Sequence, residues 1–130
     1  MPATRRTDLS AISLREWQHI QRHAEAALEH CNGTHEWSDI LNALLADKMQ
    51  LWTMGKSMIV TEVVEYPRLR SCRMFLAGGK LDELIEMATD VERSAAEIGC
   101  SQVELSGRRG WEAIGKALGY VSRGYLVKEL

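Results

Sequence analysis

A chain of 130 residues with 45% hydrophobic and 26% charged residues has the composition of one globular domain. Its formal net charge of -2 argues against a dedicated nucleic-acid-binding protein, which would carry a basic excess. No apolar run approaches the ~18 residues of a membrane span, and the N-terminus lacks the apolar core of a secretory signal. The three cysteines are far apart, which fits reduced thiols. We therefore expect a single cytoplasmic domain over residues 1–130 with no membrane partner.

A short edge strand is expected within Ala3–Leu9, and the first helix is predicted to begin after Ser13. Glu16 follows at the spacing of a capping box, in which each side chain satisfies a free backbone donor. Gly33 can adopt the left-handed conformation that ends a helix. The positions along one face of this helix are Leu14, Trp17, Ile20, Gln21, Ala24, Ala27, Leu28 and Cys31.

Three histidines lie on the opposite face of this helix. His19 and His23 are four residues apart, a spacing at which two imidazoles can bind one metal ion, and His30 lies on the same side. The sequence supplies no convincing third ligand. We therefore expect solvated histidines and no metal site.

The remaining elements follow from hydrophobic periodicity and from glycine and proline positions. Thr34 is the expected cap of the second helix, Gly55-Lys56 the turn of a hairpin, and Gly99 the stop of the long helix. In chain order the predicted elements are a helix over Trp37–Leu45, strands over Gln50–Met54, Ser57–Tyr66 and Ser71–Ala77, a helix over Leu81–Ile98, a strand over Cys100–Leu105, a helix over Trp111–Leu118 and a strand over Tyr120–Lys128.

Strands that alternate with long helices require crossover connections, so the later half should contain a parallel strand pair joined by the Leu81–Ile98 helix. The hairpin adds antiparallel strands. The pattern therefore predicts an α/β fold with a mixed parallel and antiparallel central sheet, flanked by about four helices.

Three stretches of the sequence resemble a known superfamily. Gly107–Tyr120 is similar to the fifth strand, fourth helix and closing Gly-aromatic turn of the GNAT N-acetyltransferases. Val60–Pro67 and Leu76–Gly79 look more specifically like small GNAT-like proteins encoded in phage and prophage structural modules. The resemblance implies a GNAT-like sheet and, in active members, the use of acetyl-coenzyme A.

The loop that holds the cofactor in active members of this family departs from the family pattern here. That pattern is Gln or Arg, two residues, Gly, one residue, Gly or Ala, and its backbone N–H groups bind the pyrophosphate at a helix N-terminus. The corresponding segment is Phe75–Glu83, and neither register of its glycines satisfies the pattern. If acetyl-CoA binds, the resemblance assigns Gly78, Gly79 and Lys80 to it.

Acidic residues at the start of the same helix argue against a bound diphosphate. Asp82 and Glu83 lie in the first turn, where carboxylates complement the helix dipole and repel another anion. In active members a tyrosine five residues before the closing aromatic acts as general acid, and the matching residue is Gly115. The asparagine common near the start of the last helix falls at or near Arg108.

Glu62 is the best catalytic candidate in the sequence. Alternation along the hairpin strand places it on one face with Val60 and Val64, where an apolar environment would raise its pKa toward that of a general base. The alternative is a carboxylate at a sheet edge or paired with a nearby arginine.

Exposed basic and aromatic residues are candidates for binding a partner. Arg68, Arg70 and Arg73 follow Pro67 closely in the sequence, and Arg108-Arg109 precede the last helix, so they could dock a phosphate or an acidic protein surface. Trp52, next to Thr53, could be an interface residue. The predicted interaction residues are Arg68, Arg70, Arg108, Arg109 and Trp52.

The sequence therefore predicts a non-catalytic GNAT-like protein without a cofactor that acts through protein partners. Those partners are virion proteins or a second copy of the chain, in a phage or prophage assembly role in the host cytoplasm or in a virion. The alternative is an acetyl-CoA-dependent N-acetyltransferase with a divergent cofactor loop. A third reading is a small regulatory binding protein.

Overall fold

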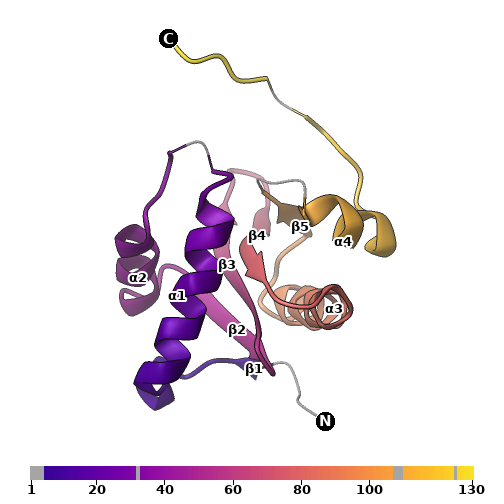
Figure 1. Ribbon diagram of the computed structural model, residues 1–130. Coiled ribbons are helices and arrows are strands. Elements are labelled where there is room, and N and C mark those ends of the chain that lie inside the picture. Colours follow the sequence, from indigo (N-terminus) through magenta and orange to yellow (C-terminus); the bar gives the residue numbers. More distant parts are fainter. Residues whose placement is uncertain (1–4, 32, 107–109, 125) are drawn as a thin grey trace.

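The computed structural model describes residues 5–31, 33–106, 110–124 and 126–130 (Figure 1). Its sheet has the order β1-β2-β3-β4-β5, in which β5 is parallel to β4 and all other neighbours are antiparallel. The predicted mixed α/β sheet is therefore confirmed. The elements are β1 (Arg5–Arg6), the 3-10 turn η1 (Leu9–Ala11), α1 (Leu14–Leu28), α2 (Trp37–Leu45), β2 (Gln50–Met54), β3 (Ser57–Glu65), β4 (Arg70–Gly78), α3 (Leu81–Glu97), β5 (Gln102–Leu105) and α4 (Gly110–Leu118).

The sheet lies between two helical layers, with α1 and α2 on one face and α3 and α4 on the other (Figure 1). Alternation along β3 sends Val60 into the core under α1, whereas Ile59 enters the core under α3. Cys72 also lies in the α3 core, where burial raises the pKa of its thiol to about 11. Within the described residues, none of the helices combines the length and apolar composition needed to cross a membrane.

Local hydrogen bonds explain where the first two helices begin. The hydroxyl of Ser13 accepts the backbone N–H of Glu16 at 3.2 Å, as the capping pattern predicts. The prediction of Thr34 as the cap of α2 is wrong, because Glu36 caps this helix in a capping box with Asp39. The hydroxyl of Thr34 instead bonds to the ring of His35.

The strand pairing of β3 and β4 contains a one-residue bulge. Val60 pairs with Leu76 and Thr61 pairs with Met74, so Phe75 has no partner residue on β3. Phe75 and Leu76 consequently both pack against the α1 core. The bulge lies where β4 continues beyond its last β5 partner.

Helix α3 makes the expected crossover between β4 and β5. The parallel register runs from Ser71 opposite Gln102 to Met74 opposite Leu105. Gly99, with φ +86, follows α3 at the predicted stop. By contrast, α1 ends at Leu28, before the stop predicted at Gly33.

The strand predicted over Tyr120–Lys128 is wrong for the residues that the structure describes there. Residues 121–124 and 126–130 form an exposed segment that leads away from the fold (Figure 1). A strand requires a neighbour to satisfy its backbone N–H and C=O groups, and this segment pairs with no strand among the described residues. At the other end, the edge strand predicted within Ala3–Leu9 is β1, in which Arg6 pairs with Trp52.

Replacement of Gly79 by alanine tests the tightest backbone approach in the fold. Gly79 has φ +131, and an added Cβ would lie 2.2 Å from Ser57 Oγ and 2.6 Å from Ser57 Cα. We expect Gly79→Ala to lower the free energy of unfolding by about 3 kcal/mol or more, since the strained backbone alone costs about 1–3 kcal/mol. Denaturant unfolding measures it.

Gly119→Ala is the matched control, because Gly119 has φ +82 but no atom within 4 Å of the added Cβ. Gly119→Ala should lower the free energy of unfolding only by the cost of the backbone strain. Equal losses of stability in the two variants would contradict the close contact at Ser57.

Candidate functional site

The N-terminus of α3 presents unpaired backbone donors. Lys80 is its N-cap residue, and its own N–H donates to the hydroxyl of Ser57 at 3.1 Å. Within the described chain, no hydrogen bond reaches the N–H groups of Leu81, Asp82 or Glu83, as is usual for an uncapped first turn. These three donors and the positive end of the helix dipole make this turn a candidate anion site.

The two acidic side chains of this turn do not cap its amides. The Ser57 hydroxyl donates to the Glu83 carboxylate at 2.6 Å, which ties Glu83 to the start of β3. Asp82 is exposed, and within the described residues no hydrogen bond joins its side chain to the turn. The amides are therefore not occupied by the protein's own carboxylates, although both negative charges remain close by.

The glycines before α3 permit close backbone contacts. An added Cβ at Gly78 would lie 2.5 Å from Nδ1 of His23, so the end of β4 packs directly on α1. His19 Nε2 bonds to the carbonyl oxygen of Lys56 at 2.9 Å, and its ring stands at a right angle to that of His23, 4.6 Å away. These two rings therefore attach α1 to the β2–β3 turn.

The histidine environment differs from the solvated one that the sequence predicted. Burial, followed by the charges of His19 and Arg22, lowers the pKa of His23. His30 is exposed as expected. In the part of the chain that the structure describes, no three His, Cys, Asp or Glu residues gather into a metal-binding group.

The edge of β4 that leads to this turn has no β5 partner. Pairing with β5 stops at Met74 and Leu105, with one further bond from the Ser106 N–H to the Met74 carbonyl at 3.2 Å. Beyond it, residues 76–78 pair only with β3 on their other side, within the described residues. Their free edge can accept an extended ligand by backbone hydrogen bonds.

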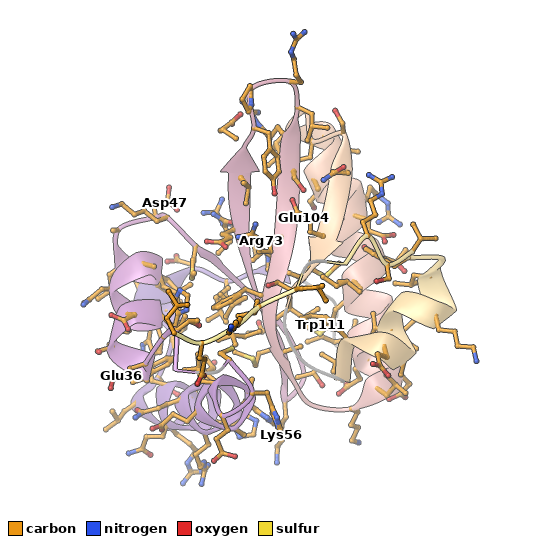
Figure 2. All side chains as sticks on the ribbon, turned by 90° about the horizontal axis from the view of Figure 1, so that it is seen from above. Glu36, Asp47, Lys56, Arg73, Glu104 and Trp111 are labelled. Atoms are coloured by element: carbon orange, nitrogen blue, oxygen red, sulfur yellow. The ribbon has the colours of Figure 1, made fainter. Side chains whose placement is uncertain are left out.

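A charged cluster centred on Arg73 lies on the sheet beside this edge. Arg73 donates to Glu62 at 2.9 Å and to Glu104 at 3.3 Å, and Figure 2 shows the side chains of Arg73 and Glu104 next to each other. The hydroxyl of Tyr66 donates to the same Glu104 carboxylate at 2.9 Å. These four residues, named the Arg73 cluster below, carry a net charge of about -1 at neutral pH.

The electrostatics of the cluster keep its central groups charged. Burial alone would raise the pKa of the Glu104 carboxyl, but hydrogen bonds from Ser71 and Tyr66 and the charge of Arg73 outweigh it and lower that pKa. Burial likewise opposes the charge of Arg73, yet the hydrogen bond to Glu62 and the nearby Glu104 raise the pKa of Arg73.

Glu62 is therefore placed beside an arginine, which was the alternative to an apolar setting. Sequence reasoning missed Glu104, because its approach to Arg73 depends on the β4–β5 register. In that register Arg73 and Glu104 are direct partners. The sequence signal that could have found Glu104 is its alternation with Gln102, which places both side chains on one face of a short strand.

The predicted interaction residues do not form one patch within the described part of the chain. Arg70 donates to Glu65 at 2.6 Å and to the carbonyl of Ile98, whereas Arg68 is exposed near the hairpin tip. Arg108 and Arg109 lie outside the described residues. The indole N–H of Trp52 donates to Thr61 at 2.9 Å, and its ring packs against the α3 core.

Gly115 has a packing role in the structure. The N–H of Tyr120 donates to the Gly115 carbonyl at 2.8 Å, and an added Cβ at Gly115 would lie 3.3 Å from both Tyr120 and Leu105. The Tyr120 hydroxyl donates to Glu92 at 2.6 Å. Burial and then Glu92 raise the pKa of Tyr120, so its hydroxyl stays protonated at neutral pH.

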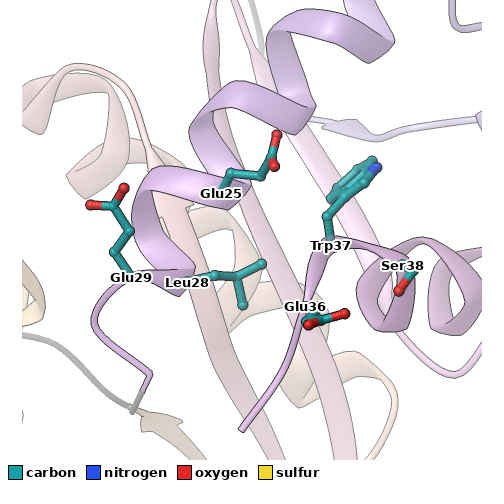
Figure 3. A pocket seen from close by; sticks show the side chains of 6 residues that line it. All are labelled: Glu25, Leu28, Glu29, Glu36, Trp37 and Ser38. Carbon is teal, nitrogen blue, oxygen red and sulfur yellow. The ribbon is translucent and has the colours of Figure 1, made fainter. Parts of the chain in front are cut away.

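An open hollow of about 540 Å³ lies between the C-terminal part of α1 and the start of α2 (Figure 3). Carboxylates and one indole line it, which favours cations over anions. Glu36 is at the same time engaged in capping α2. The lining residues are Glu25, Leu28, Glu29, Glu36, Trp37 and Ser38.

Several solved structures with a similar arrangement of elements are described as acetyltransferases. A predicted acetyltransferase from Clostridium acetobutylicum, crystallised with acetyl-CoA, superimposes with a TM-score of 0.69 at 11% identity, covering 100% of this chain and 96% of its own. The chain has a GNAT-like acetyltransferase fold. At such identities the likeness shows the fold alone. No protein-family model and no curated protein sequence matches the chain.

Two further GNAT-like neighbours support the same fold. An aminoglycoside acetyltransferase from an uncultured soil metagenomic sample, in complex with sisomicin, has a TM-score of 0.64 at 12% identity over 98% of this chain and 97% of its own. A GNAT family acetyltransferase from Staphylococcus aureus has a TM-score of 0.61 at 16% identity over 99% of this chain and 98% of its own.

The Glu104→Gln variant tests the electrostatics of the Arg73 cluster. Because the pKa of Glu104 is lowered in the folded state, its stabilising effect is present above the unfolded value near 4.5 and is lost as the pH falls through the folded value. We expect wild type to be more stable than Glu104→Gln at neutral pH, and the difference to shrink below pH ~4.5. Urea unfolding over this range measures it.

Glu97→Gln, at the exposed end of α3, is the control for a general charge effect. The free energy of unfolding of Glu97→Gln should stay close to that of wild type over the whole pH range. A Glu104→Gln difference that does not change between neutral and acidic pH would contradict the ion pair.

Proposed function

We propose that this GNAT-like chain is an acetyl-CoA-dependent N-acetyltransferase with a divergent cofactor loop. The observation that carries the proposal is the first turn of α3, whose three unpaired amides follow directly on the free edge of β4. The acetyl-CoA complex of the similar protein from Clostridium acetobutylicum supports it.

The residues of the turn fit the diphosphate end of the cofactor through their backbone. The N–H groups of Leu81, Asp82 and Glu83 would hold it, and the Lys80 side chain adds a positive charge at the rim. Ser57 favours binding indirectly, because its hydroxyl holds the Glu83 carboxylate at the start of β3. Asp82 opposes binding, which predicts a weaker affinity than a neutral turn would give.

Acetyl-CoA, when bound, supplies an activated acetyl group as a thioester. The net negative Arg73 cluster attracts a protonated amine, and Arg73 fixes the position of the Glu62 carboxylate. Glu62 is the group proposed to accept the proton that the acceptor amine releases. Gly115 has no proton donor, so the proposal assigns no general acid to that position.

A melting experiment with a matched pair of proline variants tests the proposal. Acetyl-CoA at about 100 times its Kd should stabilise the folded chain by about 2.7 kcal/mol and raise its Tm. Leu81→Pro removes one donor at the first helical position, where proline is tolerated. It should weaken acetyl-CoA binding by about tenfold or more, because a hydrogen bond to a charged group contributes about 1.5–3 kcal/mol.

Leu14→Pro is the control, since Leu14 is the exposed first residue of α1 and follows an extended cap residue in the same way. It should leave the acetyl-CoA shift unchanged. Absence of any shift for wild type at millimolar acetyl-CoA would contradict the proposal.

The acidic turn provides a second and opposite test. Asp82→Asn removes a negative charge beside the proposed diphosphate position, so acetyl-CoA should bind more tightly than to wild type, by about threefold to tenfold. Titration calorimetry measures the change. Glu86→Gln, an exposed residue one turn further along α3, should have little effect. Weaker binding by Asp82→Asn would argue against a diphosphate at this turn.

A non-catalytic, protein-binding role is the second candidate. Two departures from the family pattern favour this role. Phe75 and Lys80 stand where the cofactor loop of active members has other residues, and Gly115 has no side chain that could donate a proton. Its phage or prophage setting stays a prediction from the sequence. If acetyl-CoA does not change the Tm of the chain, the protein-binding role is the better supported of the two.

A further inference from the structure

The outer edge of β5 ends the sheet without a partner strand in the described part of the chain. The Ser106 N–H donates to the Met74 carbonyl at 3.2 Å in the register of the β4–β5 pair, which fixes the orientation of the β5 residues before it. In a parallel pair, successive residues alternate between the neighbouring strand and the opposite side. The N–H and C=O groups of Val103 and Leu105 therefore point outward from the sheet.

The chain also carries a C-terminal arm, residues 121–130, of which residues 121–124 and 126–130 are described. These described residues are exposed and pair with no strand of the described fold. Leu126 is fully exposed and Val127 is 75% exposed, and the described part forms no hydrogen bond with the rest of the described chain. Its β-branched and leucine residues favour a strand, which is what its composition predicted.

We propose that the C-terminal arm of one chain pairs as a strand with the β5 edge of a second copy, and that the second copy reciprocates. Among the residues that the structure describes, each chain offers the unpaired β5 edge and an unpaired arm, so a two-fold exchange satisfies both at once. The exchange also buries the exposed leucine and valine side chains of the arm.

The geometry of the arm favours a second copy over the chain's own edge. The arm begins at Tyr120, which is held by hydrogen bonds to Gly115 and Glu92. From this fixed point it leads away from its own sheet (Figure 1). A partner can receive it in that direction without any change in the core, whereas pairing with its own β5 would require the arm to reverse.

The experiment measures the mass of the purified full-length chain by native mass spectrometry and light scattering at micromolar concentration. We expect a dimer for wild type and a monomer for a chain that ends at Tyr120. Val103→Pro removes an outward N–H at an edge position where proline is compatible with a strand, and it should also give a monomer. Thermal melting checks that both variants remain folded.

Mixing the two variants distinguishes exchange from any other contact. The chain that ends at Tyr120 keeps its edge but has no arm, whereas Val103→Pro keeps its arm but has a blocked edge. The mixture should form a one-to-one heterodimer, while neither variant pairs with itself. A monomeric wild type, a dimer that survives arm deletion, or failure of the mixture to associate would each overturn the proposal.

Discussion

The hydroxyl of Ser57 connects the β2–β3 hairpin to the first turn of α3, and the candidate site depends on this contact. It accepts the N–H of Lys80 and donates to the carboxylate of Glu83, so one buried side chain both starts the helix and draws an acidic group to one side. Because Gly79 passes directly over Ser57, no side chain fits at that position. The result is a helix end with bare amides, which is the property that an anion site requires.

The parallel pairing of β4 with β5 places the other parts of the site around that turn. The pairing covers only the first half of β4, and the bulge at Phe75 occurs where the shared register ends. The same register brings Glu104 to Arg73, and Arg73 in turn holds Glu62. A free strand edge, a donor-rich turn and a net negative cluster therefore lie along one strand, which is an arrangement suited to an anionic donor and a cationic acceptor.

Much of the fold could be predicted because its signals are local. The apolar stripe of α3, the glycine at its end and the Gly55-Lys56 turn each act within a few residues, and the crossover rule then requires the parallel pair. The last predicted strand could not be tested by local signals. The composition around Leu126 favours a strand, but it does not show whether a neighbouring strand is present to pair with it. The cap at Glu36 is a local contact with Asp39, whereas the Ser57–Glu83 contact depends on the distance between two elements. Glu104 was missed for the same reason.

The central claim is that the backbone amides at the start of α3 bind the diphosphate of coenzyme A. Two-dimensional amide NMR of the isotopically labelled chain, titrated with coenzyme A, tests this claim residue by residue. The account predicts that the largest shifts occur at Leu81, Asp82 and Glu83 and that they saturate together. Unchanged amide signals at these three residues, with or without shifts elsewhere in the chain, would contradict it.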